Sequence, residues 1–210
     1  MKIDKNYESN YFESIQNGLK KTLFEIKKIK TSKESFFDQL VHLTIQTKKV
    51  NGRFFFIGNG ASAAFSNHMA LDWSKNGGVN SLSLSDSAII TALSNDYSYD
   101  DAFVEFLRIR GVNKNDIIIT ISSSGNSNNI INVLNYCKNA KITTVGFSGL
   151  KENNKSRFLA NFSLYVPKKT YGIVECIHQV FLHLWLDKSM GIFEWEREDF
   201  QNMNSKEFKL

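Results

Sequence analysis

Two runs of small polar residues, each directly after an apolar stretch, are the parts of this 210-residue sequence that could bind an anion. The Ser-rich turn (residues 122–127, Ser-Ser-Ser-Gly-Asn-Ser) follows a β-branched stretch, and the Gly-Asn turn (residues 58–62, Gly-Asn-Gly-Ala-Ser) follows a Phe-rich one. A helical pattern begins after each turn, and a helix start adds unpaired N–H groups and a favourable dipole to the serine hydroxyl groups. This combination suits a phosphate ester, although either turn alone could be an ordinary capped loop.

Two pairs of histidine and carboxylate residues could carry acid–base chemistry. His68 and Asp72 lie four residues apart on the helix expected after the Gly-Asn turn, so they share a face. Glu175 and His183 lie eight residues apart on a later helix, and two turns return them to nearly the same face. Together they could bind zinc or a similar divalent metal, or act as general acid and base. The same spacings also fit a surface ion pair and a buried structural histidine.

The segments that position these residues have the pattern of an α/β fold. Apolar stretches alternate with helical patterns, which predicts a single domain over residues 51–190, with a five-stranded parallel sheet flanked by helices. Strands are expected at 53–57, 79–84, 117–121, 141–147 and 162–166. Both polar turns then fall at the carboxyl edge of the sheet, where ligands usually bind.

The regions on either side of this domain are expected to differ from it. Residues 1–50 are predicted to form a helical extension, with one helix over 10–29 and another over 32–49, packed on the outside of the domain or against another subunit. Residues 191–210 are rich in acidic and aromatic side chains, and this tail is expected to dock on a neighbouring chain or to fray.

The charge, apolar runs and cysteines of the chain favour some classes of protein over others. The net charge of +5 comes without a dense stripe of Lys and Arg between aromatic residues, which favours a phosphorylated small molecule over nucleic acid. The chain has neither an apolar signal segment nor a run of membrane-spanning length, so we expect a cytoplasmic protein without membrane contact. Cys137 and Cys176 lack metal-site spacing and are expected to be buried.

In combination, four motifs resemble the sugar isomerase (SIS) domain family, and within it the phosphoheptose isomerases, over about residues 18–188. They are the Gly-Asn turn with His68, the tripeptide Asn95-Asp96-Tyr97, the Ser-rich turn, and the segment 171–175 with His183, in the family's order. The resemblance implies an isomerase that interconverts a ketose and an aldose phosphate through an enediol. The substrate it implies is sedoheptulose 7-phosphate, for bacterial heptose synthesis.

The resemblance also implies roles for individual residues. The sugar phosphate would be held by Ser62, Ser122, Ser124 and Ser127. Asn59 and Ser123 would line the pocket, and Asp96 would meet the substrate chain. The metal and catalytic cluster would be His68, Asp72, Glu175 and His183, with His183 as acid and Asp72 or Glu175 as base. The implied cofactor is a divalent metal, zinc, and the implied assembly is a homotetramer with sites at subunit boundaries.

Three departures from the family pattern keep alternatives open. Asp72 stands where the family usually has a glutamate on this helix, and Glu175 stands where it usually has a glutamine. Three positions before Glu175, Gly172 replaces an acidic residue of the family. These changes leave the identity of the base open and allow a different phosphosugar as substrate. A non-catalytic SIS module, which senses a sugar phosphate or associates with a replication initiator, is the alternative from another class. The retained histidine and carboxylate pairs favour the enzyme, because a pure binder does not need them.

Overall fold

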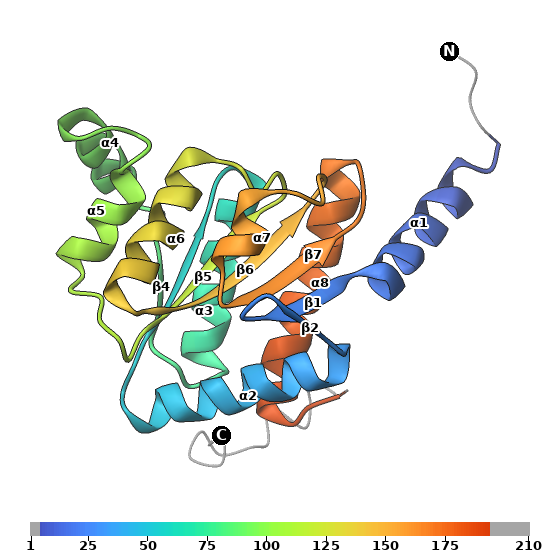
Figure 1. Ribbon diagram of the computed structural model, residues 1–210, viewed down its shortest axis with the longest axis horizontal. Helices are drawn as coiled ribbons and strands as arrows, with labels where there is room; N and C mark the ends of the chain where they lie inside the picture. The colour runs from blue at the N-terminus through green and yellow to red at the C-terminus, as the bar shows by residue number, and fades with distance from the viewer. Residues whose placement is uncertain (1–4, 194–210) are drawn as a thin grey trace.

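A seven-stranded sheet runs through the described part of the chain, residues 5–193 of the computed structural model (Figure 1). The strand order is β2-β1-β7-β6-β5-β3-β4. Five of these strands are parallel, as predicted: β3 (Phe54–Gly58), β4 (Ser81–Ser83), β5 (Ile117–Ser122), β6 (Thr143–Gly149) and β7 (Phe162–Val166). The other two are antiparallel, β1 (Leu23–Ile26) and β2 (Ile29–Thr31), and β1 pairs with β7.

The extra hairpin corrects the prediction of one helix over residues 10–29 and of a five-stranded sheet. Helix α1 (Tyr7–Lys21) ends there, and Thr22 is extended with φ −56° and ψ 134°. Lys27 and Lys28 both have positive φ values, 50° and 69°, as a two-residue hairpin turn requires. The apolar residues of 23–29 fit a helical period, but pairing with the open edge of β7 satisfies their backbone groups as strands.

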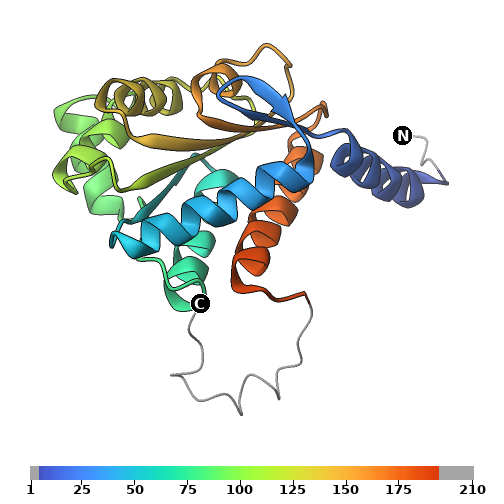
Figure 2. The ribbon, with the colours of Figure 1, turned by 60° about the horizontal axis from the view of Figure 1, so that its bottom comes forward.

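Helices cover both faces of the sheet (Figures 1 and 2). One core contains α2 (Lys33–Lys49), α3 (Ala61–Lys75) and α8 (Tyr171–Met190); the other contains α5 (Ala102–Ile109), α6 (Asn128–Ala140) and the residues beside α7 (Lys155–Leu159). Helix α4 (Ser87–Asp96) packs beside α5. Side chains alternate between the cores along β3, because Phe54 and Phe56 enter the first and Phe55 enters the second. This double burial explains the unbroken apolar run.

Helix α1 projects away from the rest of the molecule in both views, and of its fifteen residues only Gly18 is buried (Figures 1 and 2). Tyr7 and Phe12 on this helix are 60% and 64% exposed. Most of the expected tail, residues 194–210, lies outside the described residues, so its docking stays a prediction, as does the division into three regions.

Within residues 5–193, the helices lack the combination of length and apolar character that a membrane span would require. Cys137 is buried in α6, as expected, whereas Cys176 is exposed on α8, so the expectation for the second cysteine was wrong.

Candidate active site

The two polar turns lie side by side at the carboxyl edge of the sheet. Strands β3 and β5 are parallel neighbours, and Gly58 stands opposite Ile121 in their register. The Asn59 and Asn129 side-chain amides exchange two hydrogen bonds, of 3.0 and 3.1 Å, and so join the Gly-Asn turn to helix α6. The Tyr99 hydroxyl also donates to Asn59 Oδ1, at 2.7 Å. The prediction that both turns share one edge is therefore confirmed.

The Gly-Asn turn is tight because of its glycines. A Cβ on Gly58 would lie 2.7 Å from the Ser62 backbone and Cβ, so only glycine lets helix α3 begin this close to the strand. Gly60 has φ 55° and ψ −125°, a conformation that other residues resist. Ser62 is buried in the first turn of α3, and its N–H donates to Asn59 O at 3.0 Å. The turn thus places the Ser62 hydroxyl at the start of a helix.

The Ser-rich turn uses two of its hydroxyl groups internally and leaves two for other contacts. Ser122 Oγ accepts from the Gly125 N–H at 3.2 Å, and Ser124 Oγ accepts from the Asn126 N–H at 3.3 Å. Ser123 Oγ is buried without a hydrogen-bond partner within the described residues. Ser127 occupies the N-cap of α6, but its side chain makes no capping bond there. A buried hydroxyl without a partner is costly, so a ligand oxygen at this turn would satisfy it.

Three of the four predicted acid–base and metal residues come together. The ligand atoms of His68, Asp72 and His183 all lie within 4.8 Å of one another, and we call this group the His-Asp cluster. His68 Nε2 lies 3.2 Å from Asp72 Oδ2, and the His68 and His183 ring centroids are 5.2 Å apart. Helices α3 and α8 bring them together, and the two helices are held by the edge-to-face packing of Trp73 on Trp185, with centroids 5.1 Å apart. Both halves of the cluster therefore lie on one chain.

Glu175 is not part of this group, contrary to the four-residue cluster that the sequence predicted. It shares a helix face with His183, but eight residues of α8 correspond to about 12 Å along the axis. Asp96 also lies outside the cluster: it is exposed at the end of α4, where it accepts from the Asn95 amide at 3.1 Å. The catalytic role of Glu175 and the substrate contact of Asp96 stay predictions.

Two residues near His183 were missed as site candidates. Gln179 Nε2 is hydrogen-bonded to His183 Nε2 at 2.7 Å. Partial burial raises the pKa of Asp187 above its ordinary value; His183 opposes this shift, and the charge of Asp72 adds to it. Asp187 follows His183 by four residues, which is the spacing of His68 and Asp72. That repeated spacing was the available signal for a second pair.

A cavity of about 970 Å³ opens beside His183. Its walls come from α2, α3, α8 and the segment just after α8, and Phe37, Phe65 and Leu184 make them largely apolar. Within the described chain, His183 is the member of the His-Asp cluster that lines this cavity, and neither polar turn contributes to the lining.

The donor set of the His-Asp cluster fits a divalent metal. Two imidazole nitrogen atoms and one carboxylate oxygen are ligands that zinc accepts, and three protein ligands leave a fourth position open for water or substrate. Ligands of a tetrahedral zinc ion lie about 3.3 Å apart, so the cluster needs only side-chain adjustment to close on an ion.

The sequence matches the SIS domain family over residues 11–149. It is similar to curated phosphoheptose isomerases from Helicobacter pylori (strain P12), with 31% identity over 77% of this chain and 86% of that protein, and from Aneurinibacillus thermoaerophilus, with 33% identity over 70% and 76%. Its fold resembles the phosphoheptose isomerase GmhA from Neisseria gonorrhoeae, with a TM-score of 0.74 and 23% identity over 87% of this chain and 95% of that one.

Proposed function

We propose that this chain, which belongs to the SIS domain family, is a phosphoheptose isomerase that converts sedoheptulose 7-phosphate into D-glycero-D-manno-heptose 7-phosphate. Its similarity to curated phosphoheptose isomerases supports the activity and the substrate. The observation that carries the proposal is the pairing of two serine-bearing turns at one sheet edge with a cluster of two imidazoles and a carboxylate.

In this proposal, the two polar turns bind the phosphate group of the sugar. Ser62, Ser122, Ser124 and Ser127 donate hydroxyl hydrogen bonds to it, and the first turn of α6 adds backbone N–H groups and its dipole. Ser123, whose buried hydroxyl lacks a partner in the described residues, and Asn59 line the pocket. This binding fixes one end of a flexible seven-carbon chain, so that its carbonyl end reaches the acid–base residues in one orientation.

The isomerisation itself needs one base and one acid. A carboxylate removes a proton from C1 of the ketose, which gives a 1,2-enediol, and a proton returned to C2 completes the aldose. The acid moves a proton between the oxygen atoms on C1 and C2. We assign His183 as the acid and Asp72 as the base, because these two side chains lie in one cluster. Glu175 stays the alternative base.

His68, Asp72 and His183 would hold the metal ion, which we propose to be zinc. When bound, a zinc ion polarises carbonyl and hydroxyl oxygen atoms and so stabilises negative charge that develops on them. Asp187 and Gln179 surround His183, and they would orient its ring and hold its tautomer.

We also propose that the protein is a homotetramer, in which neighbouring subunits complete the site. Three features of the single chain support this assembly: the projecting helix α1, the apolar cavity beside His183, and exposed apolar side chains on α3 and α8 such as Leu71 and Val180. Light scattering coupled to size exclusion should then give about 96 kDa, four times 24.0 kDa. A mass near 24.0 kDa would contradict the assembly. The cytoplasmic location stays a prediction.

The test of function is incubation of the purified protein with sedoheptulose 7-phosphate, followed by NMR identification of the product. We expect conversion to an aldoheptose 7-phosphate, and no conversion when His183 is replaced by alanine. Conversion of another ketose phosphate in its place would identify a different substrate within the same chemistry. Binding of sugar phosphates without conversion of any of them would support the non-catalytic SIS module.

A further inference from the structure

The start of helix α7 is hydrogen-bonded to the Ser-rich turn, although the turn itself connects β5 to α6. The Ser156 N–H donates to Gly125 O at 2.9 Å, and the Lys155 N–H donates to Asn126 Oδ1 at 3.0 Å. Both acceptors lie in the turn, and both donors are in the first turn of α7, whose N–H groups have no partner within the helix. The position of α7 therefore determines the position of the turn.

Asn154 is the point of closest contact between α7 and the turn. Its side chain is fully buried, and a Cβ on Gly125 would lie 2.1 Å from Asn154 Oδ1, so this side chain packs directly against the glycine. Gly125 has φ 62°, which favours glycine in its own right. Asn154 also caps α7, because its Oδ1 accepts from the Arg157 N–H at 3.0 Å. Its Nδ2 donates to Lys151 O at 2.8 Å, which fixes the preceding loop.

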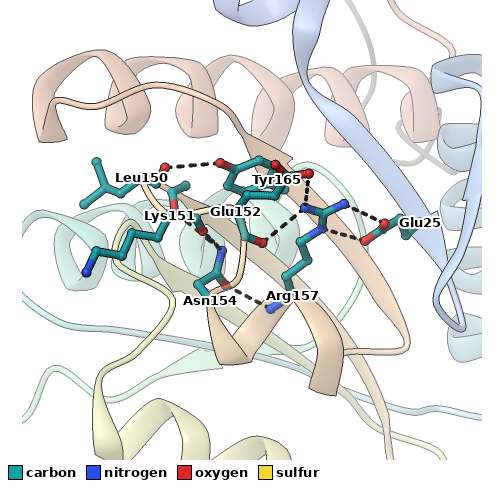
Figure 3. Close-up of polar contacts among 8 residues, drawn as sticks. Glu25, Leu150, Lys151, Glu152, Asn154, Arg157 and Tyr165 are labelled. Atoms are coloured by element: carbon teal, nitrogen blue, oxygen red, sulfur yellow. Dashed lines mark hydrogen bonds and ion pairs between the residues drawn. The ribbon is translucent and has the colours of Figure 1, made fainter.

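Arg157 anchors α7 to the rest of the sheet (Figure 3). Its Nε and Nη2 donate to the two carboxylate oxygen atoms of Glu25 on β1, at 2.9 and 2.8 Å, and its Nη1 donates to Glu152 O at 3.2 Å. The guanidinium carbon lies 4.8 Å from the centre of the Tyr165 ring. The Arg157 side chain is 8% exposed, and the paired carboxylates raise its pKa. A two-pronged pair of this kind fixes direction as well as distance.

We propose that Asn154 and Arg157 are positioning residues for phosphate binding, and that the β1 hairpin, through Glu25, fixes the Ser-rich turn in its binding conformation. The chain of contacts runs from Glu25 to Arg157, along the first turn of α7, and then through Asn154 to Gly125. A turn held in its bound geometry loses less conformational entropy when a ligand binds. This inference rests on the proposed function for the identity of the ligand, but not for the contacts.

The test compares two arginine residues that make similar ion pairs, one on α7 and one directly before β3. Arg157→Met removes the pair with Glu25. The matched control, Arg53→Met, removes the pair with the buried Asp116, which lies before β5 at the end of the sheet away from both turns. Glu25→Gln is the second variant, because it weakens the same pair as Arg157→Met, keeps the shape of the side chain, and decides the test if Arg157→Met does not fold.

Hydrogen–deuterium exchange of the protein without ligand measures directly how firmly the Ser-rich turn is held. We expect exchange over residues 122–127 to rise about 10-fold in Arg157→Met and to stay within about twofold of wild type in Arg53→Met. We also expect KM for sedoheptulose 7-phosphate to rise about 10-fold in Arg157→Met, with kcat within about twofold, and to stay unchanged in Arg53→Met. Unchanged exchange in the folded Arg157 or Glu25 variant, or an equal rise in the Arg53 control, would overturn the inference. If the wild-type protein isomerises no sugar phosphate, the proposed function fails, and the exchange result still decides the positioning role.

Discussion

His68 on α3 and His183 on α8 face each other with their ring centroids 5.2 Å apart, although they lie in distant parts of the sequence. Asp72 joins them, within hydrogen-bonding distance of His68. Each helix contributes through residues on one face, and the Trp73–Trp185 contact between the helices sets their separation. The cluster therefore depends on core packing as much as on its own residues.

Replacing His183 by alanine should separate catalysis from phosphate binding. The imidazole is proposed to move a proton in the transition state, so its loss should lower kcat by about 10²- to 10⁴-fold. Inorganic phosphate, measured by calorimetry, should bind within about threefold of wild type, because the polar turns remain intact. Equal losses of turnover and of phosphate binding would contradict separate roles for the cluster and the turns.

Replacing Ser123 by alanine should weaken binding of the sugar phosphate without destabilising the protein. Its hydroxyl is buried without a partner within the described residues, so its removal breaks no bond in the free protein. A hydrogen bond from this pocket-lining hydroxyl to an oxygen atom of the ligand contributes about 0.5–1.5 kcal/mol, so Kd for sedoheptulose 7-phosphate should rise about 2- to 10-fold. Ser163→Ala on β7 is the matched control, since that hydroxyl is also buried and unpaired in the described chain. An equal change in Kd for both variants would remove Ser123 from the site.

Replacing His68 by alanine should lower the metal content of the protein. The purified wild type, loaded with zinc and dialysed, should retain about one ion per chain by elemental analysis, and the variant should retain a small fraction of that. His42→Ala is the control, because His42 also contacts a side chain four residues along its helix, Gln46, but lies on α2 outside the cluster. Zinc retained fully by the His68 variant would contradict the assignment of this ligand.

Stability should fall below neutral pH because of His178. Burial lowers the pKa of this side chain from 6.5 to about 4, against the opposing hydrogen bond to the Ser148 carbonyl. Between these pH values the unfolded chain binds a proton that the folded chain does not, so acidification favours unfolding. From pH 7 to pH 5 this group should remove about 2 kcal/mol from the free energy of unfolding.

Urea unfolding of wild type and His178→Gln at both pH values checks this expectation. Because His178 is fully buried, its replacement also changes packing at pH 7, so the quantity to compare is the change in stability between pH 7 and pH 5. That change should be smaller in the variant by about 2 kcal/mol. Identical changes would show that His178 does not titrate as its burial requires.

The parallel part of the fold followed from the sequence, whereas the hairpin did not. Strands buried on both faces, such as β3 and β5, appear in the sequence as short, largely apolar runs rather than as alternating ones. Residues 23–29 are apolar at positions that fit a helix as well as a strand. Their structure is decided by the free edge of β7, which lies far away in the sequence. Local periodicity carries no information about such an edge.

The sequence predicted which helices carry the site residues, but not the distances between residues on different helices. Spacing placed His68 with Asp72 and put Glu175 on the face of His183, because a helix fixes which residues share a face. Spacing does not tell which turn of one helix meets which turn of another. The packing of α3 on α8 joins the turn of His183 to the His68 pair and leaves Glu175 two turns away. The same packing adds Asp187, for which the sequence offered only the repeated spacing.

The most direct test of the account is isomerisation of sedoheptulose 7-phosphate in D₂O, followed by NMR at C2 of the aldose product. Proton transfer through an enediol, by a carboxylate that exchanges with solvent, should place deuterium at C2 in a measurable fraction of the product. The His183→Ala variant should form no product in the same time. Full retention of the substrate proton at C2 over many turnovers would indicate a hydride shift, and it would contradict the acid–base role proposed for Asp72 and His183.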